Sequence, residues 1–210
     1  EDTAWGCGGY LKEKPLGTWG DIGTFSFDFA KTITTGEGGM LVCKSKDIYS
    51  KASAWHDHGH ENNPKYPRWE DSRSSSGFNF RMSELQGAVG IAQLKKLDEI
   101  VSKQRKNKSI LWNKIKGING IEARETPFGA YETSDALVFL VQSNYLARKC
   151  RKELISKGLN TKILPEAYSW HFAGEWNHMK ELVGSNEKNL KLTYQKSHEI
   201  LSRAVAIPIY

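Results

Sequence analysis

The sequence predicts a mixed α/β protein on three observations: two short strands around a glycine-rich turn, a clearly marked helix in the middle, and a strand followed by a helix later on. The first two strands are residues 24–27 (TFSF) and 40–43 (MLVC), whose aromatic, β-branched and apolar side chains are typical of short buried strands. Between them, the segment 36–39 (GEGG) has a composition that glycine-dependent turns require.

A helix and a long loop follow these strands. Residues 47–55 are predicted to be helical. The polar stretch 56–76 has no periodicity and contains Pro64 and Pro67. We therefore expect a loop there, and loops of that length in compact proteins are usually functional or mobile.

The clearest helix signal begins at Ser83. Ser83 and Gln86 have the spacing of a capping box, and apolar residues follow at helical spacing. We expect this helix to continue, with a possible break, towards Lys116, where Gly117 interrupts the pattern. A helix of that length suits a connection between two domains.

The second half of the chain predicts a small α/β domain. Residues 136–141 (ALVFLV) have the pattern of a central strand, and residues 145–157 that of an amphipathic helix closed by Gly158. Residues 164–179 are rich in aromatic side chains and histidine, and Pro208 indicates a final strand or turn.

Composition limits the class of protein. The chain has 210 residues, 39% hydrophobic, which suffices for a real core. Its cysteines, Cys7, Cys43 and Cys150, are widely spaced, which indicates reduced thiols and a cytoplasmic protein. No apolar run is long enough to span a membrane, and no secretion signal is visible. Because the first residue is Glu1, we interpret the chain as part of a longer protein.

The net charge of +6 raises the question of nucleic acid. Much of the excess lies in residues 95–116 and 148–162, interleaved with apolar residues at helical spacing. Solvated helix faces explain this better than a phosphate-binding stripe, although a basic pocket for an anionic cofactor or substrate is also compatible. No nucleic-acid-binding module is present, so we expect no nucleic-acid partner.

Lys31 is the candidate catalytic residue. It follows the strand TFSF after a short spacer and precedes the glycine-rich run TITTGEGG. A lysine between an apolar strand and a polar turn is partly desolvated, which frees its amine as a nucleophile towards an aldehyde.

Two segments around this lysine carry a family resemblance. Residues 20–41 (GDIGTFSFDFAKTITTGEGGML) and 77–98 (GFNFRMSELQGAVGIAQLKKLD) resemble the DegT/DnrJ/StrS group of sugar aminotransferases, which are fold-type I enzymes dependent on pyridoxal 5′-phosphate (PLP). With the opening EDTAWGCGGYL, the resemblance covers about residues 1–115 and is looser beyond.

The resemblance implies a role for each matching residue. Lys31 would form the Schiff base with PLP and act as general base, and Asp2 would pair with the pyridine nitrogen. Ser26 would bind the cofactor phosphate, and Asn79 would reach the phosphate of the neighbouring subunit's cofactor. A homodimer with shared active sites follows. Taken without the motifs, Asp2 could be a cap, Ser26 a strand hydroxyl and Asn79 part of an Asx turn.

Two histidine-containing segments have weaker functional interpretations. His56, His58 and His60 alternate along the chain and could gather at zinc, but the family carries no metal at this place, and we expect none. Family members place a histidine and aromatic residues over the sugar, so Trp170 and His171 are candidate substrate contacts, with an aromatic satellite core as the alternative.

The resemblance implies the later portion of a fold-type I enzyme: part of the large three-layer α/β/α domain plus a small C-terminal α/β domain. We assign residues 1–98 to the PLP-binding domain, 99–120 to a connecting helix and 121–210 to the small domain. The family's first half, with further phosphate-binding elements, has no counterpart here. Many relatives also carry histidine or glutamine where this chain has Trp5, near the cofactor ring.

The implied activity is transamination, cycling between PLP and its pyridoxamine form (PMP), from glutamate or another donor to a keto or aldehyde carbon of a sugar. A nucleotide-linked keto-sugar or an acidic keto-sugar, used in surface polysaccharide or lipopolysaccharide, is the expected substrate. One rival is a PMP-dependent sugar dehydratase of the same fold, but those relatives have histidine in place of Lys31. The other rival is a non-catalytic nucleic-acid-binding protein.

Overall fold

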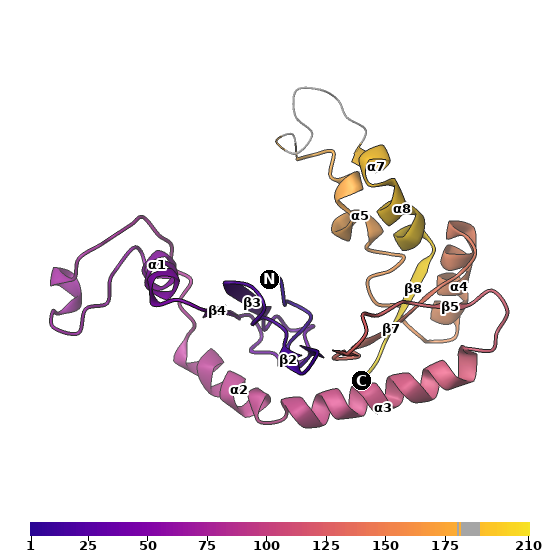
Figure 1. The fold of residues 1–210 in the computed structure, drawn as a ribbon, viewed down its shortest axis with the longest axis horizontal. Coiled ribbons are helices and arrows are strands. Elements are labelled where there is room, and N and C mark those ends of the chain that lie inside the picture. The colour runs from indigo at the N-terminus through magenta and orange to yellow at the C-terminus, as the bar shows by residue number, and fades with distance from the viewer. Residues whose placement is uncertain (180, 182–189) are drawn as a thin grey trace. The chain divides into compact units, whose positions relative to one another are not determined.

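The computed structural model describes residues 1–179, 181 and 190–210, which form two compact units (Figure 1). The first unit comprises residues 1–102 and 127–133, and the second comprises residues 103–126 and 134–210.

The first unit is organised around strand β3 (Ile22–Ser26), which pairs antiparallel with β4 (Gly39–Cys43) along its whole length. On the other edge of β3, Asp2 and Thr24 form a parallel bridge, which brings the first residues of the chain beside the strand. A second small sheet has the order β2 (Lys14–Pro15), β1 (Tyr10–Leu11), β6 (Ala130–Tyr131). The two predicted strands and the turn between them are confirmed.

The burial predicted for β4 is wrong. Met40, Leu41 and Val42 are all exposed, with Met40 at 53% of its full exposure. Among the residues that the structure describes, β3 and β4 form a sheet of only two strands. An apolar strand composition indicates the element but does not by itself decide which neighbours cover it.

Glycines at two positions let the loop before β3 lie close to the strand. Gly17 has φ +86°, and a Cβ there would lie 2.3 Å from the ring of Phe25. A Cβ on Gly23 would lie 2.0 Å from the carbonyl oxygen of Gly17. Larger residues at either place would push the loop off β3.

The helices of the first unit begin and end as their sequence signals predict. Helix α1 (Lys46–His56) starts at Ser45, whose side chain accepts a hydrogen bond from the Ile48 N–H. The loop that follows contains one short 3₁₀ turn, η1 (Arg68–Glu70). Figure 1 shows α2 (Glu84–Leu94) followed after a short break by α3 (Leu97–Ile115), whose later turns belong to the second unit.

The capping box predicted at the start of α2 is present. The Ser83 hydroxyl accepts from the Gln86 N–H, and the Gln86 side chain accepts from the Ser83 N–H. Gln86 also donates to the Glu37 carbonyl at 2.7 Å, so the cap ties α2 to the turn between β3 and β4. The helix start and the glycine-rich turn are therefore fixed together.

The second unit contains an antiparallel sheet of three strands in the order β5 (Glu122–Ala123), β7 (Ala136–Leu140), β8 (Ala204–Pro208). Strand β7 is central, as predicted. Helix α4 (Asn144–Ser156) follows it, capped by Ser143 and ended near Gly158, which has φ +79°.

The core of the second unit lies between this sheet and helices α3 and α4. Because side chains alternate along β7, Leu137 and Phe139 lie on the same face of the sheet, where α4 contributes Ala147. The buried members are Leu137, Phe139, Val141, Ala147, Val205 and Ile209, with Leu111, Trp112, Ile115 and Leu154 packed against them.

The basic stretches of α3 and α4 lie mainly on exposed faces, which fits the solvated-face interpretation. Lys108 is an exception because it is partly buried. Burial, with the nearby charge of Arg124 acting in the same direction, lowers the pKa of Lys108 to about 8. No helix within the described ranges is both long and apolar enough to cross a membrane.

The remaining helices of the second unit are short. They are α5 (Tyr168–His171), η2 (Ala173–Glu175), α7 (Leu190–Thr193) and α8 (Gln195–Ser202). Phe172, between α5 and η2, is buried among the rings of Tyr168, Tyr194 and His198.

We predict that Phe139→Ala lowers the free energy of unfolding by about 3–5 kcal/mol, because it leaves a cavity between β7 and helices α3 and α4. Urea unfolding followed by circular dichroism measures this change. Phe128→Ala is the control, since Phe128 is 95% exposed and its loss should change stability by less than about 0.5 kcal/mol. Equal effects of the two substitutions would contradict the assigned core.

Candidate active site

The candidate site lies around β3, where three separate stretches of chain meet. The opening residues pair with one edge of the strand, Ser26 ends the strand, and Lys31 lies on the turn that follows. The amine of Lys31 lies 3.6 Å from the ring centroid of Trp5, three residues after Asp2. The cation–π contact therefore brings the opening segment, which carries Asp2 and Trp5, next to the loop that carries Lys31.

Lys31 is held on a loop with a narrow neck. Phe27 forms the neck: its N–H donates to the Gly38 carbonyl at 2.8 Å, and its carbonyl accepts from the Thr35 N–H at 2.9 Å. Within the loop, the Lys31 N–H donates to the Asp28 carbonyl at 3.1 Å. Lys31 is half-buried, as expected for a lysine that follows an apolar strand.

Asp2 is placed by backbone pairing with β3. The N–H of Thr3 donates to the Thr24 carbonyl at 2.9 Å, and the N–H of Thr24 donates to the Glu1 carbonyl at 2.9 Å. The Asp2 carboxylate accepts a hydrogen bond from the Ala4 N–H at 3.0 Å and is otherwise exposed. This is an Asx turn, and it leaves the second carboxylate oxygen available for another donor.

Ser26 lies two residues after Thr24, on the same face of β3, because side chains alternate along a strand. Its hydroxyl accepts from the Asp28 N–H at 3.4 Å. Ser26 thus faces the beginning of the lysine loop. Its strand position and its contact with the loop are compatible with either interpretation of the hydroxyl.

Asn79 lies apart from this cluster, on a segment paired with the end of α1. Asp57 and Asn79 form an antiparallel bridge, and the Phe80 N–H donates to the His56 carbonyl at 2.9 Å. The Asn79 side chain is exposed, and its oxygen accepts from the Arg81 N–H at 3.4 Å. Phe78 and Phe80 flank Asn79 in the sequence, and their rings stack on each other with centroids 5.5 Å apart.

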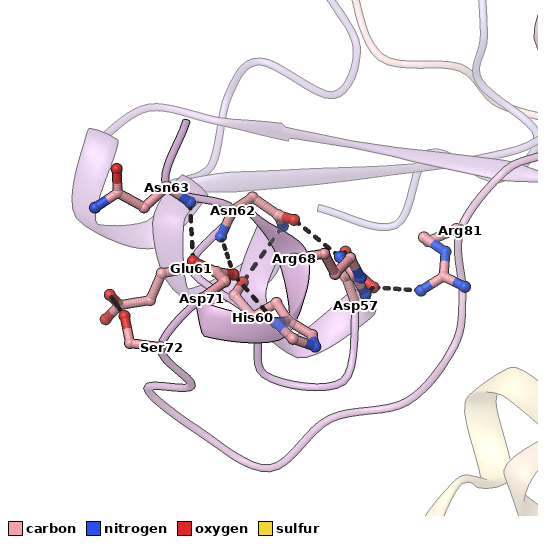
Figure 2. A network of polar contacts seen from close by, with 9 residues as sticks. All are labelled: Asp57, His60, Glu61, Asn62, Asn63, Arg68, Asp71, Ser72 and Arg81. Atoms are coloured by element: carbon pink, nitrogen blue, oxygen red, sulfur yellow. Dashed lines mark hydrogen bonds and ion pairs between the residues drawn. The ribbon is translucent and has the colours of Figure 1, made fainter. Parts of the chain in front are cut away.

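A buried carboxylate organises the segment that carries Asn79 (Figure 2). Asp57 is 3% exposed and accepts two hydrogen bonds from Arg68, at 2.6 and 2.7 Å, and another from Arg81. The Arg68 guanidinium holds the pKa of Asp57 well below its usual range, and Arg81 acts in the same direction against the effect of burial. The loop is therefore fixed to the end of α1 at two points.

A second carboxylate fixes the middle of the loop. Asp71 accepts from the N–H groups of Asn63 and Asn62, at 3.0 and 2.9 Å, and from the His60 ring at 3.1 Å. The Asn63 N–H makes the largest contribution in lowering the pKa of Asp71. Figure 2 shows both carboxylates surrounded by loop residues.

The alternating histidines do not gather. His60 is buried against Asp71, the His56 ring bonds to the Ser53 carbonyl at 2.5 Å, and His58 is exposed with φ +56°. No group of three metal-ligating side chains is present among the residues that the structure describes. His60 therefore takes part in the hydrogen bonding of the loop.

Trp170 and His171 lie on α5 in the second unit, and both are exposed, Trp170 at 77%. The aromatic satellite core expected as the alternative does exist, but it is built by Phe172 and Tyr168 with His198. Trp170 and His171 therefore remain candidates for contact with a ligand.

Sequence reasoning missed Asp57, Arg68 and Arg81 as the residues that shape the loop. They are distant in sequence, at positions that no short motif connects, so only the folded loop reveals the pairing. Trp5 departs from the family pattern, and its contact with Lys31 lies outside what the sequence predicts. An aromatic residue and a lysine far apart in sequence give no signal of such a contact.

The model of the DegT/DnrJ/EryC1/StrS aminotransferase family matches residues 1–210. GDP-perosamine synthase of Escherichia coli O157:H7 is 32% identical over 171 residues, covering 81% of this chain and 44% of that protein. The enzyme of the same name from Vibrio cholerae is 37% identical over 118 residues, covering 56% and 31%.

Solved structures have the same fold. The sugar aminotransferase CalS13 of Micromonospora echinospora aligns with a TM-score of 0.77 and 22% identity, over 100% of this chain and 52% of its own. The PLP form of Spr1654 from Streptococcus pneumoniae, described as a sugar aminotransferase by resemblance, gives 0.76 and 18% over 100% and 52%. The predicted fold class is confirmed, and the chain spans less than half the length of the two curated relatives above.

We predict that Asp57→Asn lowers the free energy of unfolding at about pH 7 by roughly 1.5–3 kcal/mol, because it weakens charged hydrogen bonds to two arginines. Asp57 has a lowered pKa in the folded state, so its contribution is present above the unfolded value of about 3.9 and is lost as pH falls below that value. The difference between variant and parent should therefore shrink towards about pH 3.

Urea unfolding across this pH range measures the effect. Asp47→Asn is the matched control: Asp47 pairs with Lys51 at 2.8 Å, but both side chains are largely exposed. Its loss should cost less than about 1 kcal/mol. A pH-independent difference for Asp57→Asn would refute the ionic role of this carboxylate.

Proposed function

Because the chain belongs to the DegT/DnrJ/EryC1/StrS aminotransferase family, we propose that its protein transfers an amino group to a carbonyl carbon of a sugar, with Lys31 binding pyridoxal 5′-phosphate. The contact of the Lys31 amine with Trp5, beside Asp2 and Ser26 on β3, is the observation that carries this proposal. The amine of Lys31, the carboxylate of Asp2 and the hydroxyl of Ser26 thus lie around one strand.

These three groups suit the chemistry of the cofactor. The aldehyde of PLP requires an amine, its pyridine nitrogen requires a carboxylate, and its phosphate requires hydroxyl and N–H donors. Lys31 is half-buried and Asp2 retains an acceptor oxygen, while Ser26 ends its strand next to the loop that carries Lys31. The donor set therefore fits.

Each residue has a defined task in this proposal. Bound PLP supplies an electron sink for the carbon that gains or loses a proton. Lys31 holds the cofactor covalently and, when released, carries the proton at its Nζ between cofactor and substrate carbons. The Asp2 carboxylate keeps the pyridine nitrogen protonated, and the Ser26 hydroxyl orients the phosphate.

The substrate we propose is a nucleotide-linked keto-sugar, with glutamate as the amino donor. The names of the relatives support the nucleotide-linked sugar: besides the GDP-perosamine synthases, a Campylobacter jejuni relative is a UDP-4-amino-4,6-dideoxy-N-acetyl-β-L-altrosamine transaminase. An acidic keto-sugar is the alternative, given the net charge of +6. Exposed Trp170 and His171 are the proposed sugar contacts, and surface polysaccharide or lipopolysaccharide is the proposed destination.

One relative favours a second candidate. GDP-4-keto-6-deoxy-D-mannose 3-dehydratase of Escherichia coli O55:H7 is 34% identical over 128 residues. Dehydratases of this fold have a histidine in place of the Schiff-base lysine, whereas this chain has Lys31. A lysine at this position favours amino transfer, and the appearance of an amino-sugar rather than a deoxy-keto-sugar distinguishes the two activities.

We further propose that residues 1–98 belong to a cofactor domain, 99–120 to a connecting helix and 121–210 to a small domain. The Asp57 contacts, which hold the segment with exposed Asn79, support a role for this asparagine at the cofactor phosphate of a second subunit, and hence a homodimer. The free Cys7, Cys43 and Cys150 suit a cytoplasmic location.

We predict that sodium borohydride treatment of the complete protein with PLP attaches the cofactor to Lys31, as peptide mass spectrometry would show. In Lys31→Ala this attachment is lost, and amino transfer falls by at least about 10²-fold, because both the covalent hold and the general base are removed. Lys51→Ala, at an exposed position on α1, should retain both properties. Attachment at a lysine other than Lys31 would overturn the proposal.

We predict that two inactive variants complement each other if active sites are shared. In a heterodimer of Lys31→Ala and Asn79→Ala subunits, one site lacks both residues and the other has both intact. Co-expression should therefore restore up to about half of the parent activity per dimer, although each homodimer has little. Purification through two different affinity tags isolates the heterodimer, and no gain over the homodimers would argue against sharing through Asn79.

A further inference from the structure

The distance between amine and ring is shorter in the contact of Trp5 with Lys31 than in the other cation–π pair described in the structure. The Lys31 amine lies 3.6 Å from the ring centroid of Trp5, whereas Lys14 lies 4.6 Å from Trp19, which is exposed. Trp5 and Lys31 are both half-buried. Since cation–π attraction strengthens as water is excluded, the Trp5 pair is the stronger of the two.

Trp5 is held from both sides by its backbone. Thr3 is buried and hydrogen-bonded to β3, and the Gly6 N–H donates to the Thr3 carbonyl at 2.9 Å. The carbonyl of Trp5 accepts from the Thr133 hydroxyl at 3.3 Å. A Cβ on Gly6 would lie 2.7 Å from the Thr3 side chain, so this turn is closely packed. The indole thus projects from a fixed piece of backbone.

The lysine is anchored independently. The neck at Phe27 closes its loop, Ile33 is buried, and the Ala30 N–H donates to the Asp28 carboxylate at 2.9 Å. Lys31 itself has four flexible carbons beyond its Cα, and ordering them costs up to about 2 kcal/mol in rotamer entropy. A fixed aromatic face beside the amine offsets part of that cost by restricting where the side chain lies.

We propose that Trp5 is a positioning residue for Lys31: its indole face holds the lysine ammonium group in place whenever Lys31 is not bonded to the cofactor. The inference rests on the proposed function, in which Lys31 alternates between bonded and free forms. When Lys31 is not bonded to the cofactor, a side chain held at one place stays close to the carbon with which it reacts in each cycle. Fewer side-chain conformations then have to be sampled before the reaction.

The test is competitive labelling of the cofactor-free complete protein with a trace of acetic anhydride, with Lys51 as the internal reference. An amine held against a ring must leave it to react, so Trp5→Leu should raise the relative labelling of Lys31 by roughly 2- to 30-fold, the range that typical cation–π strengths imply. Trp5→Phe keeps an aromatic face and should give a smaller rise.

Trp19→Leu is the matched control, because it removes the ring beside Lys14 and should leave the labelling of Lys31 unchanged. If Trp5→Leu unfolds, all lysines become equally reactive, and Trp5→Phe and Trp5→Gln then decide by the same measurement. Unchanged labelling of Lys31 in folded Trp5 variants, or an equal rise in Trp19→Leu, would overturn the inference.

A second readout separates this inference from the proposed function. With PLP and borohydride, folded Trp5→Leu should still be labelled at Lys31, and with substrates it should show a lowered kcat and a nearly unchanged KM. Absence of borohydride labelling in the parent protein would reject the proposed function. Normal labelling of the parent with a parental kcat in Trp5→Leu would reject the positioning role alone.

Discussion

The hydrogen bonding on both edges of β3 is the constraint on which the candidate site depends. On one edge, Thr24 accepts a backbone hydrogen bond from Thr3 and donates one to Glu1, and on the other edge β4 pairs along the full strand. Because backbone pairing fixes register, the side chains at the start of the chain acquire defined positions relative to Ser26 and Lys31. The aromatic contact of Trp5 with Lys31 is a consequence of that register.

Two kinds of constraint thus operate in the first unit. Around β3, backbone pairing and close glycine packing place the groups, while in the loop after α1 the carboxylates of Asp57 and Asp71 do so. In this loop, buried carboxylates that collect N–H and guanidinium donors add to the backbone hydrogen bonds. Asn79 is held by both kinds of constraint, because its backbone pairs with that of Asp57 and the Asp57 carboxylate bonds the nearby Arg81.

The sequence predicted those features that depend on neighbours in the chain. The capping box at Ser83, the strand at β7 and the glycine after α4 are local, because propensity and capping act over three or four residues. The exposure of β4 and the pairing of Asp57 with Arg81 could not be predicted, because each depends on which distant segment arrives at that place. The motifs identified Lys31 by resemblance, but its contact with Trp5 required the folded chain.

The proposed sugar contacts in the second unit are supported differently from the groups on β3. Trp170 and His171 lie on the short helix α5, which is joined to α8 by the hydrogen bond between the Tyr168 hydroxyl and the His198 ring. Burial, with the nearby charge of Glu175 acting in the same direction, raises the pKa of the Tyr168 hydroxyl to about 12. The placement of Trp170 and His171 thus depends on aromatic packing and a side-chain hydrogen bond, whereas the placement of the groups around β3 depends on backbone pairing.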